Sequence, residues 1–123
     1  MTRGLITIVL FSLIGSPLAA QEAPSEPGPP SQAERQRNNA AKLAGLVAFV
    51  DASCADLKSD PDKFQMAVTR LGVDPDELTR GDLQLRAKAY TEIYQKDAEA
   101  SCNRAAETFG ASGKAIPGLI VRK

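Results

Sequence analysis

Apolar residues recur every third or fourth position in three stretches of the chain, which is the spacing of one face of an α-helix. The first stretch predicts a helix over residues 33–58, the second a helix from Asp60 to Gly72, and the third, the most regular, a helix over residues 82–109. The three apolar stripes consist of Leu43, Val47, Val50, Cys54 and Leu57, widened by Leu46 and Phe49; of Phe64, Val68 and Leu71; and of Leu83, Ala87, Tyr90, Tyr94, Ala98, Cys102, Ala105 and Phe109.

Aspartate and glycine residues mark where the expected helices start and stop. Asp60 and Asp74 each precede a proline, and an Asp–Pro pair suits the first turn of a helix because the carboxylate caps free N–H groups. Glu77 stands three residues after Asp74, the spacing of a capping box, and Gly72 suits the left-handed end of a helix. Asp82 begins the third helix. The polar residues 34–42 are expected to fray or to project beyond the core.

Residues 1–20 have the three parts of a secretory signal peptide. Arg3 supplies a positive charge, residues 5–14 are mostly apolar, and Ala19 and Ala20 form a small-residue cleavage site. The alternative is a membrane anchor, but the apolar segment is shorter than the roughly 20 residues that span a bilayer. Residues 21–32 carry four prolines and no large apolar side chain, which predicts a disordered linker. The folded domain is therefore expected over residues 33–123 of an exported chain.

The two cysteines, Cys54 and Cys102, fall on the apolar stripes of the first and third expected helices. Two cysteines in a short exported chain indicate one disulfide, and two buried free thiols are the alternative. Antiparallel helices would hold these residues roughly 30 Å apart, so a bridge requires the two helices to run parallel. The sequence thus predicts an all-α fold, a small three-helix bundle running down, up and down with one disulfide across its parallel pair. Closing a loop of 48 residues should add about 4 kcal/mol of stability.

Composition and charge argue against several classes of function. The chain has 15 Lys and Arg against 15 Asp and Glu, and removing Arg3 with the signal peptide leaves 14 against 15, so nucleic acid and anionic membrane surfaces are not expected as partners. The chain has no histidine, and both cysteines are expected in the bridge, which removes the usual nucleophile–base pairs. The acidic clusters at 60–62 and 74–77 are better explained as helix caps than as catalytic pairs, and they lack calcium-loop spacing. No metal, cofactor or transmembrane span of the mature chain is expected.

Two groups of apolar and aromatic residues could take part in binding. Tyr90 and Tyr94 share one face of the third helix, where core packing is favoured over a ligand cage. The C-terminal segment carries a small apolar patch that either folds back onto the bundle or docks a partner. The candidate partner-binding residues of this patch are Ile116, Leu119, Ile120 and Val121.

Several short motifs follow one another in order between residues 50 and 120. They are Cys54-Ala-Asp-Leu57, Leu71-Gly-Val-Asp-Pro-Asp-Glu-Leu78, Cys102, Phe109-Gly110 with Gly113, and Pro117-Gly118-Leu119. As a set they resemble a group of small exported two-cysteine helical proteins of alphaproteobacteria, rhizobia-like ones in particular. The resemblance implies a Gram-negative periplasm and carries over no activity. The segment Ser53–Leu57 is also similar to the first cysteine region of HdeA-type periplasmic acid-stress chaperones, although no Trp precedes Cys54 and the Asp–Pro helix starts have no counterpart there.

These observations favour a non-enzymatic protein of the periplasm or envelope that binds another macromolecule, an envelope protein for example, through the C-terminal patch. An acid-activated periplasmic chaperone of the HdeA type is the alternative. A periplasmic enzyme is the weaker alternative. The sequence does not indicate an oligomeric state or a particular partner.

Overall fold

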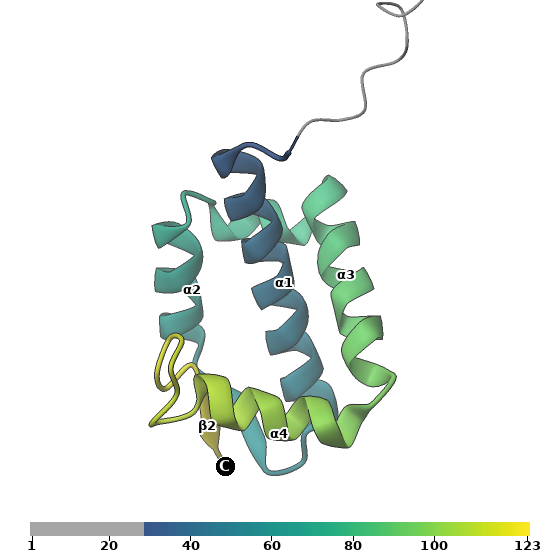
Figure 1. Ribbon diagram of the computed structural model, residues 1–123, viewed down its shortest axis with the longest axis vertical. Helices are drawn as coiled ribbons and strands as arrows, with labels where there is room; N and C mark the ends of the chain where they lie inside the picture. The colour runs from purple at the N-terminus through teal and green to yellow at the C-terminus, as the bar shows by residue number, and fades with distance from the viewer. Residues whose placement is uncertain (1–28) are drawn as a thin grey trace, which may run out of the picture.

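The computed structural model describes residues 29–123, in which one central helix is flanked by the other elements (Figure 1). The predicted signal peptide, residues 1–20, and residues 21–28 of the predicted linker lie outside the described residues. The predicted helical class is confirmed, and the structure adds a fourth α-helix and a two-stranded sheet. The elements in chain order are α1 (Gln32–Ser53), β1 (Leu57–Ser59), α2 (Pro61–Arg70), the 3-10 helix η2 (Pro75–Thr79), α3 (Gly81–Gln95), α4 (Ala98–Phe109) and β2 (Ile120–Arg122).

The central helix α1 is helical from Gln32, and its buried residues begin at Ala40, so the fraying expected for residues 34–42 was wrong. Ser31 caps the helix, because its hydroxyl accepts a hydrogen bond from the N–H of Glu34 at 3.1 Å. Ala40 and Ala41 are fully buried. The polar residues around them have partners in η2 and α3, which no local pattern discloses. Arg37 pairs with Glu77 at 3.3 Å, Glu34 with Arg86 at 2.7 Å, and the Asn38 amide donates to the Tyr90 hydroxyl at 2.8 Å.

Helix α1 ends at Ser53, before the predicted end at residue 58, because the following residues form a strand. β1 pairs with β2 in antiparallel register, with Leu57 opposite Arg122. The Asp51 carboxylate accepts hydrogen bonds from the N–H and the hydroxyl of Ser59, both at 2.8 Å, and so holds the turn between α1 and β1. Leu57 is buried as its spacing predicted, but it lies in a strand, and the strand that pairs with it comes from the C-terminal end of the sequence.

The two Asp–Pro helix starts are confirmed. The Asp60 carboxylate accepts hydrogen bonds from two N–H groups in the first turn of α2, at 3.0 and 3.2 Å, and Asp74 accepts one at 3.0 Å at the start of η2. Gly72 follows α2 with a φ of 77°, the left-handed conformation expected of it. The capping box was wrong, since the Glu77 side chain pairs with Arg37.

The predicted single helix over residues 82–109 is two helices, α3 and α4, with a corner between them. Asp97 caps α4 by accepting a hydrogen bond from an N–H of its first turn at 3.2 Å, and the Ser101 hydroxyl donates to the backbone carbonyl of Tyr94 at 2.9 Å. Asp82 caps no helix end and pairs instead with Arg86 at 2.8 Å. Apolar positions continue at helical spacing across the corner because both helices bury residues in the same core. Periodicity alone therefore could not show the break.

Helix α3, the first part of the predicted third helix, runs parallel to α1 (Figure 1). The two helices meet at Gly45, where an added Cβ would lie 2.5 Å from the carbonyl oxygen of Ala87 and 2.7 Å from the Cβ of Tyr90. Only glycine permits this approach of the two backbones. The Thr91 hydroxyl donates to the Gly45 carbonyl at 2.9 Å and adds a polar link at the same place.

Cys54 and Cys102 form the predicted disulfide, with their Cα atoms 5.7 Å apart. Helices α1, α2 and α3 run down, up and down as expected (Figure 1). Cys102, however, lies in α4. This helix crosses the lower end of α1 and brings the sulfur of Cys102 to Cys54, the residue that follows α1. The bridge therefore joins α1 to a transverse helix, and not to the helix parallel to it.

Removing the bridge should lower the free energy of unfolding by roughly 2–5 kcal/mol, because the unfolded chain regains the freedom of a loop of about 48 residues. Urea unfolding of Cys54→Ser, Cys102→Ser and the double variant measures this loss. All three should lose the same stability, since each removes the same bridge. Ser53→Ala, at an exposed neighbouring position, is the control. Equal midpoints for oxidised and reduced wild-type protein would contradict the prediction.

Candidate functional site

The C-terminal segment packs against the helices, which is one of the two alternatives left open by the sequence. Leu119 and Ile120 are 0% and 1% exposed, so neither can contact a partner while the domain keeps this fold. Val121 is half-buried in β2, and Ile116 packs against the core while remaining partly exposed. Among these four candidate partner-binding residues, only Ile116 lines the pocket described next.

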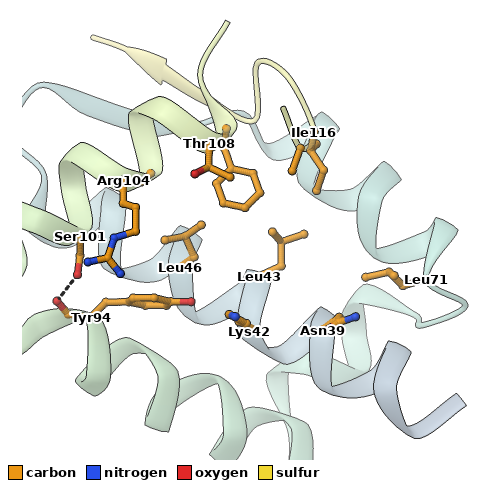
Figure 2. Close-up of a pocket in the computed structure, with 13 residues that line it drawn as sticks. Asn39, Lys42, Leu43, Leu46, Leu71, Tyr94, Ser101, Arg104, Thr108 and Ile116 are labelled. Carbon is orange, nitrogen blue, oxygen red and sulfur yellow. Dashed lines mark hydrogen bonds between the residues drawn. The ribbon is translucent and has the colours of Figure 1, made fainter. Parts of the chain in front are cut away.

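A pocket of about 500 Å³ lies between α1, the end of α3, α4 and the loop that follows α4 (Figure 2). Leu43 and Leu46 of α1 form its floor and are almost buried. Leu71 from the end of α2 and Ile116 from the loop stand at one side of this floor (Figure 2). Phe109, the last residue of α4, contributes a further apolar wall. The pocket therefore opens directly onto the edge of the hydrophobic core.

Tyr94, from the end of α3, closes the side of the pocket opposite Leu71 and Ile116 (Figure 2). Its ring rests against the buried ring of Phe49, with centroids 5.9 Å apart, which holds it in place. Burial raises the pKa of the Tyr94 phenol above its ordinary value, while the nearby Arg104 acts in the opposite direction. The phenol therefore keeps its proton at neutral pH and can donate a hydrogen bond into the pocket.

The charged residues that line the pocket are Lys42 of α1 and Arg104 of α4, and both are exposed. None of the residues that line it, within the part of the chain that the structure describes, is an Asp or a Glu. The Ser101 hydroxyl is occupied by its hydrogen bond to the Tyr94 carbonyl. Asn39 and Thr108 supply further polar groups. The pocket thus combines an apolar floor with positively charged side chains at its rim.

The other residues singled out from the sequence have structural roles. Tyr90 accepts a hydrogen bond from Asn38 and belongs to the packing between α1 and α3. Asp60 and Asp74 cap helices. Over residues 29–123, no three His, Cys, Asp or Glu side chains are grouped so as to hold a metal ion, and none of the helices there has the length and apolar composition needed to cross a bilayer.

Sequence reasoning placed the floor of the pocket in the core and did not single out Lys42 or Arg104. Leu43 and Leu46 lie on the apolar face of α1, but spacing cannot tell which part of that face a neighbouring helix covers. The one local feature of the sequence that could have indicated the corner beside this pocket is Asp97, because aspartate is a common N-cap residue and here it caps α4.

Comparisons with known proteins found no protein-family model, no curated protein and no solved structure that matches this chain. The resemblances to exported alphaproteobacterial proteins and to HdeA-type chaperones stay predictions. The function is therefore argued from the geometry of the pocket.

Replacing Leu119 with Ala should lower the free energy of unfolding by about 2–5 kcal/mol, because it leaves a cavity in the core. Leu85→Ala is the matched control, since Leu85 is 66% exposed on α3. That control should change stability by less than about 0.5 kcal/mol. Urea unfolding measures both variants, and equally small changes would show that the tail is not part of the core.

Proposed function

We propose that this protein is a non-enzymatic binding protein of the bacterial envelope and that its pocket receives an apolar part of its partner. The observation that carries the proposal is a pocket of about 500 Å³ present in the folded chain. This volume lies within the roughly 300–1,000 Å³ typical of ligand sites, which combine apolar walls with a few orienting polar groups. The proposed binding site is therefore the pocket and not the C-terminal patch. Ile116 lines the pocket, whereas Leu119 and Ile120 are buried in the core.

An open pocket supports this role over that of an acid-activated chaperone. A chaperone of that kind exposes apolar surface after its tertiary packing is lost. Here Leu43 and Leu46 line the pocket while the helices are in place. Binding therefore requires no unfolding.

The groups around the pocket also support binding over catalysis. Both cysteines are in the disulfide, and the sequence holds no histidine. The Ser101 hydroxyl donates to a backbone carbonyl, and no carboxylate is found among the described lining residues to act as its base.

A neutral apolar dye such as Nile red should bind the protein, and Ala115→Trp should weaken that binding about tenfold or more, because the indole ring fills the pocket. Ala115 is exposed and lines the pocket, so the substitution leaves the core unchanged. Ala111→Trp places the same ring on the same loop outside the pocket and should bind as wild type does. Dye fluorescence titration measures all three. Absence of binding by wild type, or equal loss in both variants, would contradict the proposed site.

Export is the second part of the proposal and rests on Arg3, the apolar residues 5–14 and the small residues Ala19 and Ala20. Expressed in a Gram-negative host, the protein should enter the periplasm with its N-terminus at or near Gln21, as measured by mass spectrometry. Leu10→Arg interrupts the apolar segment and should keep the protein in the cytoplasm. A wild-type form that retains Met1 in the membrane fraction would contradict export.

A further inference from the structure

We propose that the pocket binds a long-chain carboxylate, with the acidic head between Lys42 and Arg104 and the aliphatic chain on Leu43 and Leu46. This inference rests on the proposed function, since it names the class of ligand for the same pocket. Three features support it: the unpaired cations at the rim, the lack of Asp and Glu among the described residues that line the pocket, and the path available to the aliphatic chain.

Lys42 and Arg104 reach the pocket from two different helices, α1 and α4 (Figure 2). The ion pairs found within residues 29–123 all involve Arg37 or Arg86, so neither Lys42 nor Arg104 is paired with a carboxylate there. Charges beside an apolar, low-dielectric wall act on a bound ion more strongly than they would in bulk water. The rim therefore favours a ligand that carries a negative charge.

The lining of the pocket is positively charged, although the chain as a whole has no net charge. The full sequence has equal numbers of basic and acidic side chains, 15 of each. The described lining of the pocket nevertheless contains two cations and no carboxylate, and so does that of a second hollow beyond Ile116, where the cations are Lys63 and Arg70. Such one-sided charge attracts anions and discriminates against neutral or cationic ligands of the same shape.

A carboxylate suits the groups at this rim. The planar guanidinium of Arg104 can donate two parallel hydrogen bonds to it, and the protonated phenol of Tyr94 can donate another. Both residues line the same side of the pocket (Figure 2). In Figure 2 the Tyr94 hydroxyl points toward Lys42, and Arg104 lies beside the other end of the tyrosine side chain, so hydrogen-bond donors stand at both ends of this residue.

The aliphatic chain has a path beyond the first pocket. A second hollow of about 470 Å³ shares Leu71 and Ile116 with it and is lined by Met66 and Pro117. The Lys63 ammonium of that hollow donates to the Pro117 carbonyl at 3.3 Å, and the other cation of its lining, Arg70, is exposed. Tyr94 lines the first pocket and not this hollow, so the head is placed beside Lys42 and Arg104, where the phenol adds a hydrogen-bond donor. The chain therefore runs from Arg104 toward Met66.

Ile116, at the boundary of the two hollows, has a φ of 39°. A β-branched residue rarely adopts this left-handed conformation, so its backbone is strained. A shift of the loop that relaxes Ile116 would alter the wall that the two hollows share. The strained residue thus lies where a long chain would have to pass.

Titration of the purified protein with dodecanoate and dodecanol, followed by displacement of the neutral dye, tests the head group. Dodecanoate should bind about tenfold more tightly than dodecanol, because only the acid can accept charge-assisted hydrogen bonds from the rim. Arg104→Gln should weaken dodecanoate about tenfold and leave dodecanol unchanged. Lys88→Gln removes an exposed cation of α3 outside the pocket and should change neither.

A series from octanoate to tetradecanoate tests the path of the chain. Each added methylene should tighten binding about fourfold while apolar surface remains to be covered. Met66→Ser, at a residue that is 53% exposed, should reduce the gain for the longest chains and leave octanoate unchanged. A gain that is the same in Met66→Ser and wild type would overturn the placement of the chain.

The outcomes separate this inference from the proposed function. Equal affinity for dodecanoate and dodecanol, tighter binding of lysophospholipid than of the carboxylate, or capture of an acidic peptide in preference to either would overturn the inference while the dye still binds. Loss of all dye and amphiphile binding would overturn the proposed function as well.

Discussion

The covalent bridge between Cys54 and Cys102 is the constraint on which the arrangement of the domain depends. It ties the residue after α1 to a position within α4 and so holds α4 across the end of α1. β1 begins three residues after Cys54 and pairs with β2, which brings the buried Leu119 and Ile120 to the same end of the domain. One bond thus holds the ends of a central helix, a transverse helix and a small sheet together.

The pocket follows from this arrangement. Because α4 crosses the lower end of α1, Leu43 and Leu46, about two to three turns above Cys54, are left beside the loop after α4 and the ring of Tyr94 (Figure 2). Aromatic residues make up only 5% of the chain, so few side chains are large enough to fill the angle between the helices. The same two helices bring Lys42 and Arg104 to the rim, and neither forms an ion pair within residues 29–123.

Shape and charge together favour a binding role. An apolar floor provides affinity in proportion to the surface it covers, whereas charges at the rim decide which head group is accepted. Tyr94 connects the two, since its ring packs on Phe49 in the core and its hydroxyl belongs to the polar side of the pocket. A ligand with one acidic head and one aliphatic chain matches both parts of this site.

The sequence by itself determined the helical class, the caps at Asp60 and Asp74, and the disulfide. These features depend on hydrogen bonds within one helical turn or on the short reach of a covalent bond, so they can be argued from residue type and spacing. The corner at Asp97, the pairing of Leu57 with Arg122, and the pocket with Lys42 and Arg104 were decided only by the tertiary structure. Each of these features joins segments that are far apart in the chain. Helical periodicity predicts that a residue is buried, but it does not predict which segment covers it.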